Sequence, residues 1–242
     1  MNQLGGCGYC LRVMTAESSA SIEVDRDITR LFGLVSDALE RATDALLRGR
    51  VAIGQGVVDS DHQIDELTRT LSRFVWEQID SSSSNIDDLR HWVAVLMILP
   101  ELERSADLAE HIARRAVQDV GLEMSSACQG YIQRMSEVAL EMWEAVGVAF
   151  ADRSAQGVMV DEADEEIDIL HDRLTQEVAA GTMPANVVGD VILLGRFYER
   201  FGDHAVNLAR RIGTLPGARE SARDETPLPK RCAWSGIVGR NG

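Results

Sequence analysis

Acidic residues recur in this sequence as pairs whose spacing suits cation binding. Asp61 and Asp65 form a D-x-x-x-D pair, and Glu103 and Asp107 form an E-x-x-x-D pair further along the chain. Side chains four residues apart lie on one face of a helix, where like charges repel each other. Helix propensity therefore does not explain these pairs. Clusters made only of carboxylate oxygens suit hard cations such as Mg²⁺, Ca²⁺, Mn²⁺ or iron.

Both kinds of pair occur a second time. The segment VVDSDHQIDEL at 57–67 matches VMVDEADEEIDIL at 158–170 over the pattern D-x-x-I-D-x-L. LPELERSADLAEHIARR at 99–115 likewise matches GRFYERFGDHAVNLARR at 195–211. Corresponding residues are 103 positions apart in the first match and 96 positions apart in the second. The longer serine-rich loop of the first copy accounts for the difference. Two different pairs repeated in the same order indicate one structural unit used twice.

The acids fall in slots that the apolar period assigns to the inward face of each helix or to its edge. Asp61 follows Val57 and precedes Ile64, and Glu103 follows Leu99. Carboxylates at such positions need arginine partners, shared protons or cations, because removing them from water is costly. Arg104 directly follows Glu103 and so points about 100° away from it. Solvated acidic faces, or pairing with arginines between bundles, remain the alternatives to metal binding.

The elements that must position these acids are helices. Apolar residues recur at steps of three and four, and the chain has only five prolines. We expect an all-α protein of six helices arranged as two tandem three-helix bundles. The helices are predicted at 25–48, 51–79, 86–116, 122–150, 154–180 and 184–212. The glycines at 54 and 56 lie inside a helical pattern, which indicates close helix packing.

We divide the chain into four parts. A flexible leader covers residues 1–24, a first repeat covers 25–118, a second repeat covers 119–214 and a disordered tail covers 215–242. The leader and the tail show no apolar period, and the tail holds three of the five prolines.

Composition excludes several classes of protein. The formal net charge is −15, so a nucleic-acid backbone is a poor partner, whereas basic proteins and cations are favoured. The longest uncharged apolar run, at 92–100, is far shorter than the roughly 20 residues that span a bilayer. The leader lacks the features of a signal peptide, so we expect a cytoplasmic location. Cys7 and Cys10 lack a second pair of zinc ligands, and Cys128 lies on a helical pattern that predicts burial.

A carboxylate-bridged metal enzyme and a metal-free helical scaffold are the competing interpretations. Di-metal enzymes built on helical bundles use E-x-x-H motifs. The chain has five histidines, and none follows a glutamate of the repeated pairs at that spacing. His111 shares a face with Asp107, but Asn207 takes its place in the second copy, so the repeat does not support a histidine ligand.

The repeated segments resemble the PhoU family of phosphate-signalling proteins. The resemblance rests on LPELERSADLAEHI, RFYERFGDHAVNLARRI and the two D-x-x-I-D segments, and it covers residues 25–213. The aromatic form RFYERFGDHA resembles the actinobacterial branch. The resemblance implies two three-helix bundles with multinuclear metal clusters. The implied ligands are Asp61, Asp65, Glu103 and Asp107 in the first copy, and Asp164, Asp168, Glu199 and Asp203 in the second.

The resemblance also implies a function. Proteins of this family are regulators of phosphate uptake and not enzymes. They link a phosphate ABC transporter, through its ATPase, to a membrane sensor histidine kinase, and they repress the starvation response when phosphate is plentiful. They often form homodimers, and they reach the membrane only through these partners. The leader and the tail lie outside the resemblance, so it implies nothing about them.

Overall fold

The structure, a computed structural model, describes residues 19–81, 86–153, 160–181 and 183–216. Within these residues the chain forms helices and no strands, which confirms the all-α prediction. The helices are α1 (Ser19–Arg48), α2 (Val51–Ser81), α3 (Ile86–Val117), α4 (Val120–Glu123), α5 (Ser126–Ala151), α6 (Val160–Ala179) and α7 (Ala185–Ile212).

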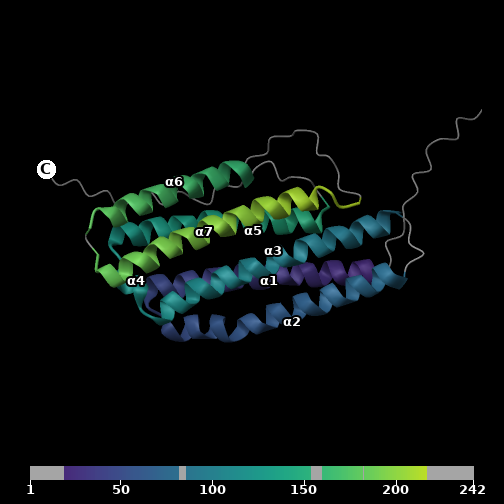
Figure 1. Ribbon diagram of the computed structural model, residues 1–242, viewed down its shortest axis with the longest axis horizontal. Helices are drawn as coiled ribbons and strands as arrows, with labels where there is room; N and C mark the ends of the chain where they lie inside the picture. The colour runs from purple at the N-terminus through teal and green to yellow at the C-terminus, as the bar shows by residue number, and fades with distance from the viewer. Residues whose placement is uncertain (1–18, 82–85, 154–159, 182, 217–242) are drawn as a thin grey trace, which may run out of the picture.

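The helices form two three-helix bundles, as the repeat predicts. Helices α1, α2 and α3 pack together, and so do α5, α6 and α7. The bundles meet through α1 against α5 and α3 against α7, which leaves α2 and α6 on opposite outer edges (Figure 1). Each helix pair that carries the acids, α2 with α3 and α6 with α7, therefore joins an outer helix to an inner one. The predicted division at residue 118 falls in the turn between α3 and α4, and it stays a prediction.

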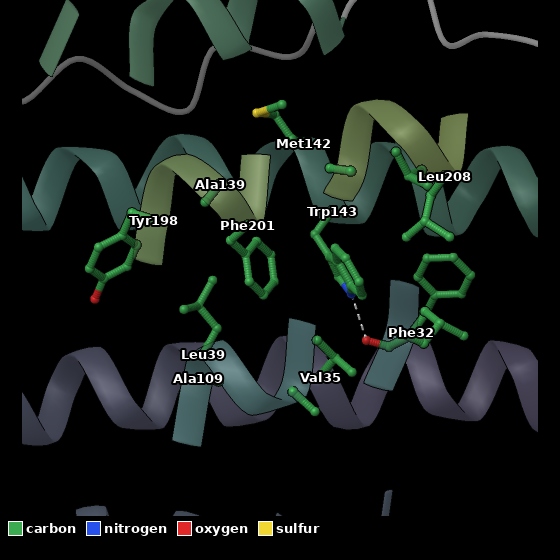
Figure 2. Close-up of a cluster of buried hydrophobic side chains, with 14 of the residues drawn as sticks. Phe32, Val35, Leu39, Ala109, Ala139, Met142, Trp143, Tyr198, Phe201 and Leu208 are labelled. Atoms are coloured by element: carbon green, nitrogen blue, oxygen red, sulfur yellow. Dashed lines mark hydrogen bonds between the residues drawn. The ribbon is translucent and has the colours of Figure 1, made fainter. Parts of the chain in front are cut away.

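One hydrophobic core runs through both bundles, and its largest side chains lie between them. The indole of Trp143 on α5 lies 4.7 Å from the ring of Phe201 on α7 and 5.3 Å from that of Phe32 on α1 (centroid distances). Its Nε1–H donates to the Phe32 carbonyl at 3.0 Å (Figure 2). The buried hydroxyl of Tyr198 is hydrogen-bonded to that of Thr43 at 2.7 Å. Aromatic packing and satisfied buried hydroxyls thus fix the two repeats against each other.

Two helix boundaries differ from the prediction. Helix α1 begins at Ser19, six residues before the expected start at Asp25, because Ser21 and Val24 extend the buried stripe by two more steps. A short helix, α4, precedes α5 where one helix was expected, and Ser125 caps α5 by accepting a hydrogen bond from the Cys128 N–H at 3.2 Å. The predicted helix start at 154, the first eighteen residues and the tail beyond 216 lie outside the described residues.

Glycines close two of the helical hairpins. Gly49 between α1 and α2 has φ of 63°, and Gly181 after α6 has φ of 80°, a region that residues with a Cβ rarely adopt. Cys128 is fully buried, as its helical pattern predicted. Over the described part of the chain, no helix combines the length and the hydropathy needed to cross a bilayer.

Candidate metal centres

The first candidate site lies where α2 and α3 run side by side. Asp61 and Asp65 project from α2, and Asp107 projects from α3. One carboxylate oxygen from each of the three lies within 4.8 Å of the others. Gly54 allows this close approach of the helices, since a Cβ there would lie 3.2 Å from the Ala113 carbonyl oxygen. The prediction of close helix packing is thus confirmed at Gly54.

Burial and, after it, electrostatic repulsion disfavour the ionised carboxylates at this first site. Partial burial, followed by the charges of Asp65, Glu110 and Asp107, raises the pKa of Asp61 from 3.8 to about 6. Burial and neighbouring carboxylates also raise the pKa values of Glu103 and Asp107. A site whose carboxylates bind protons this readily is short of positive charge. A hard cation would supply that charge and would displace the protons.

The structure changes the predicted membership of the first site: Glu103 lies outside the close group of carboxylates, and Glu110 lies near it. Glu103 is exposed and lies outside the group of three close carboxylates, although its charge interacts with those of Asp65 and Asp107. Glu110, which we did not predict, lies close enough to raise the pKa of Asp61, and it pairs with Arg114 on its own helix. The signal for Glu110 was present in the sequence, because it lies three residues after Asp107 and so shares its face.

The second candidate site lies between α6 and α7. Burial, then the charges of Asp168 and Asp203, raise the pKa of Asp164 from 3.8 to about 6. A Cβ on Gly202 would lie only 2.9 Å from the Asp164 carboxylate oxygen, so Asp164 rests directly against the backbone of α7. Burial, Glu199 and Asp203 raise the pKa of Asp168 as well. The charges of the matching acids thus interact in both bundles, and Asp61 and Asp164 carry the largest pKa shifts among them. Among the described residues, however, three carboxylates converge within 4.8 Å only in the first bundle.

Glu199 gives the second site a different chemistry. Its carboxylate is paired with Arg196, which lies three residues earlier on α7. Its Oε2 is buried and accepts no hydrogen bond within the described residues, although the Nδ1 of His171 on α6 lies 3.2 Å away. The sequence offered R-x-x-E spacing as a signal for Arg196. It offered none for His171, because that contact is made between helices.

The acids lie at the boundary of the core, not within it. Asp61, Asp65, Asp164 and Glu199 are partly buried, whereas Glu103, Asp107, Asp168 and Asp203 are exposed. The sequence predicted that these acids lie on the inward face of each helix or at its edge. The structure places them at the edge and not on the inward face. Edge positions leave the carboxylates open to ions from solvent while still weakening their hydration.

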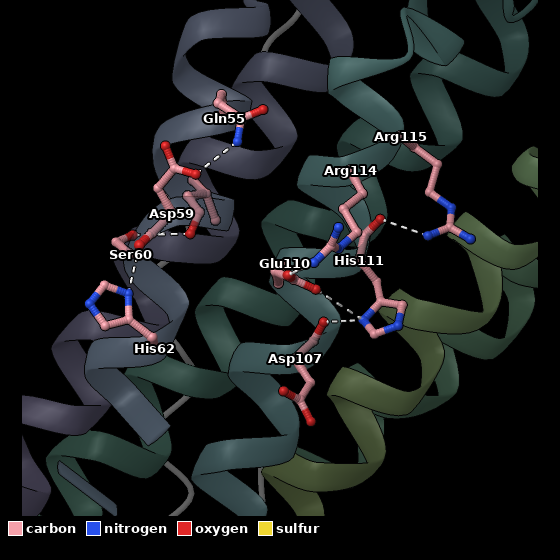
Figure 3. A network of polar contacts seen from close by, with 10 residues as sticks. Gln55, Asp59, Ser60, His62, Asp107, Glu110, His111, Arg114 and Arg115 are labelled. Atoms are coloured by element: carbon pink, nitrogen blue, oxygen red, sulfur yellow. Dashed lines mark hydrogen bonds and ion pairs between the residues drawn. The ribbon is translucent and has the colours of Figure 1, made fainter. Parts of the chain in front are cut away.

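The histidines near the first site are hydrogen-bonded to backbone carbonyls, and the Nδ1 of His111 also lies 3.8 Å from the Oε2 of Glu110. His111 Nδ1 donates to the backbone carbonyl of Asp107 at 2.5 Å, and its ring lies 5.4 Å from that of Phe197 (Figure 3). His62 Nδ1 donates to the Asp59 carbonyl at 2.7 Å. In the second bundle, His204 turns to Ser105 of α3, with 3.0 Å between Nδ1 and the hydroxyl oxygen. The first site therefore offers oxygen ligands, as predicted.

The fold and the paired carboxylates define a helical protein built from two repeats, each with an acidic site between its second and third long helices. The chain belongs to the PhoU family: the model of the PhoU domain matches residues 28–116 and again residues 132–212. Both matches carry the four acids of their repeat.

Known relatives cover almost the whole fold. The chain is 28% identical to the phosphate-specific transport system accessory protein PhoU homolog 1 of Mycobacterium leprae, over 85% of this chain and 99% of that protein. It is 29% identical to PhoU homolog 2 of Mycobacterium tuberculosis, over 82% and 95%. The crystal structure of PhoU from Pseudomonas aeruginosa superposes with a TM-score of 0.75 at 25% identity, covering 81% of this chain and 97% of that one.

Proposed function

We propose that this protein is a PhoU-type accessory protein of phosphate uptake that regulates transport and catalyses no reaction. The observation that carries the proposal is the PhoU domain in both halves of the chain. Support also comes from relatives named as phosphate-specific transport system accessory proteins, which match over more than four fifths of the chain. The protein would act in the cytoplasm, as a homodimer.

Its regulatory role, in this proposal, is to repress the phosphate-starvation response while phosphate is plentiful. It would do so by linking the ATPase of the phosphate ABC transporter to a sensor histidine kinase. Long helical faces and a net charge of −15 suit docking onto basic surfaces of such partners. Free phosphate is a poor direct ligand for so acidic a surface, unless bound metal supplies positive charge.

We further propose that Asp61, Asp65, Glu103 and Asp107 hold one metal centre and that Asp164, Asp168, Glu199 and Asp203 hold the other. Two observations support metal binding at these residues. In the first site three carboxylates converge within 4.8 Å, and in the second the Oε2 of Glu199 is buried without a hydrogen bond from any described residue. A bound cation would offset both the burial and the carboxylate repulsion that raise the pKa values of Asp61 and Asp164. Mg²⁺, Ca²⁺, Mn²⁺ and iron all accept such oxygen ligands, and the imidazole of His171 favours iron among them in the second centre.

Deletion of the gene tests the regulatory role. In cells grown with abundant phosphate, a phosphate-starvation reporter should be repressed in the wild type and active in the deletion strain. Reintroducing the wild-type gene should restore repression, because the linkage between transporter and kinase is restored. A deletion strain that still represses the reporter, in a genome without a second PhoU protein, would contradict the proposal.

Gly202→Ala tests the second metal centre without removing a ligand. The new methyl group would lie 2.9 Å from the Asp164 oxygen and 3.1 Å from Ile167, so the carboxylate must move. We expect Mn²⁺ affinity at the second centre to fall about tenfold, as it does when the support of a ligand is disturbed. Calorimetric titration measures this affinity. Gly189→Ala is the matched control, because its Cβ would meet nothing within 4 Å on the same helix. Equal affinity in the two variants would exclude Asp164 as a ligand.

A further inference from the structure

The proposed ligand Glu199 is already engaged by basic side chains of the protein itself. Its Oε1 forms an ion pair with the guanidinium of Arg196, which lies one turn earlier on α7. Its other oxygen, Oε2, is buried and lies 3.2 Å from the Nδ1 of His171 on α6. Each oxygen of this carboxylate therefore faces a nitrogen atom of a basic side chain.

These two basic groups differ in what they can do with a metal ion. A neutral imidazole has a free electron pair and ligates metals, whereas a guanidinium stays protonated and has hydrogen-bond donors only. His171 can therefore share an ion with Glu199, but Arg196 can only compete with that ion for the same carboxylate. The side chain of Arg196 is 44% exposed, so it can turn into water when an ion takes its place.

The charge of Arg196 reaches most of the second site. Its hydrogen bond to Glu199, and then the charges of Glu199, Asp203 and Asp168, raise the pKa of the guanidinium, although burial acts in the opposite direction. Three of the four proposed ligands thus interact with this one arginine. The positive charge that stabilises these carboxylates in the metal-free protein would repel a cation bound among them.

The contact between His171 and Glu199 is specific to the second repeat. A Cβ on Gly195 would lie 2.9 Å from the Cδ2 of His171, so the imidazole rests against the backbone of α7. The repeat spacing places Leu99 at the position of Gly195 and Thr68 at that of His171. A glycine on α7 thus makes room for the imidazole, whereas the first repeat has a large residue on α3 and a small one on α2.

The first repeat also lacks the competing arginine. The repeat spacing places Pro100 at the position of Arg196, so no arginine lies one turn before Glu103. The charges of Arg104 and Arg69 lower the pKa of Glu103, but neither side chain forms an ion pair with it in the described part of the chain. The carboxylate of Glu103 is therefore open to an ion from solvent.

One further pair of arginines is common to both repeats. Arg114 and Arg210 occupy matching positions, and their charges lower the pKa values of the matching Asp61 and Asp164. This influence acts on both sites, so it does not distinguish them.

We propose that Arg196 is a built-in competitor of metal at the second centre, because it holds Glu199 in the metal-free protein and must leave before Glu199 ligates an ion. The second centre therefore fills at a higher free metal concentration than the first, where three carboxylates already converge within 4.8 Å. Its occupancy is then the one that follows changes in metal supply. This inference rests on the proposed function in one respect, which is that both groups of acids bind metal.

A Mn²⁺ titration of the full chain tests the competition. The background variant Asp61→Asn/Asp65→Asn disables the first centre, and the electron paramagnetic resonance signal of free Mn²⁺ reports binding at the second. Adding Arg196→Met should raise the Mn²⁺ affinity about tenfold. Arg200→Met is the matched control, because it removes the same charge from an exposed residue of α7 that forms no ion pair with Glu199 among the described residues. This control should stay within about threefold of the background at 0.15 M salt, where exposed charges are screened. Circular dichroism verifies that the variants are folded.

The chain with both centres intact provides a second readout. Mn²⁺ should bind in two phases, and Arg196→Met should tighten the weaker phase while leaving the tighter phase unchanged.

Three results would overturn the proposal. An unchanged affinity in the Arg196 variant would show that the arginine does not compete with metal. An equal gain in the Arg196 and Arg200 variants would show a general effect of charge. Absence of Mn²⁺ binding in every variant of the background would remove the second metal centre itself, and with it any competition. The first two results leave the metal centre in place, and none of the three alters the deletion phenotype, so each failure is distinguishable from failure of the proposed function.

Discussion

Replacing Gly121 with alanine is expected to lower the free energy of unfolding by about 3 kcal/mol or more. Gly121 is buried in α4, the segment that joins the two repeats. A Cβ there would lie 1.7 Å from the carbonyl oxygen of Leu46 and 2.6 Å from its carbonyl carbon. Both atoms belong to the backbone of α1, so no side-chain rotation relieves the overlap. Helix α4 must move away from α1, and the packing between them is lost.

Denaturant unfolding followed by circular dichroism measures this loss, and soluble yield provides a second readout. Gly130→Ala is the matched control, because Gly130 is exposed in α5 and a Cβ there meets nothing within 4 Å. Alanine is the better helix former, so this control should gain up to about 1 kcal/mol. The two substitutions are chemically identical and should act in opposite directions. A Gly121 variant as stable as the wild type would show that α4 does not hold this position in solution.

Neutralising Asp61 is expected to stabilise the metal-free protein near pH 7.5. The pKa of this carboxyl is raised to about 6 in the folded chain, chiefly by burial and then by Asp65, Glu110 and Asp107. The folded state therefore takes up a proton as the pH falls through 6, whereas the unfolded state does so only near 3.8. The stability that this group contributes is present at low pH and is lost as the pH rises through 6. Asp61→Asn should thus raise the thermal midpoint at pH 7.5 and leave it nearly unchanged at pH 4.

Bound metal should reverse the sign of the stability difference between Asp61→Asn and the wild type at pH 7.5. An ion bound only to the folded state adds about 2.7 kcal/mol of stability when its free concentration is 100 times its Kd. With Mn²⁺ at pH 7.5, the wild type should therefore gain more stability than Asp61→Asn, which lacks one of the proposed ligands. Thermal scans in EDTA and in Mn²⁺ provide the comparison. Glu66→Gln removes an exposed carboxylate from the same helix and should respond to Mn²⁺ as the wild type does. An unchanged midpoint on Mn²⁺ addition in all three proteins would contradict metal binding.

The helical class and the repeat can both be predicted from the residues alone. Side chains four apart must share a helix face, so the helical period by itself pairs Asp61 with Asp65 and Glu103 with Asp107. The matching segments also predict that the second copy repeats the first. Helix ends are harder to predict, because the buried Ser21 and Val24 extend α1 through contacts that only packing reveals.

Which acids meet depends on the packing between helices. Three carboxylates converge in the first repeat while Glu103 stays exposed, and Glu199 in the second is instead held by Arg196 beside His171. These outcomes depend on how far the helices stand apart, which small residues such as Gly54 and Gly202 set through contacts between helices. The helical period determines the direction in which each side chain points. The distance between two helices depends instead on how they pack. Two acidic pairs in each repeat thus follow from the sequence, and the packing of α2 on α3 and of α6 on α7 gives the two candidate sites different surroundings.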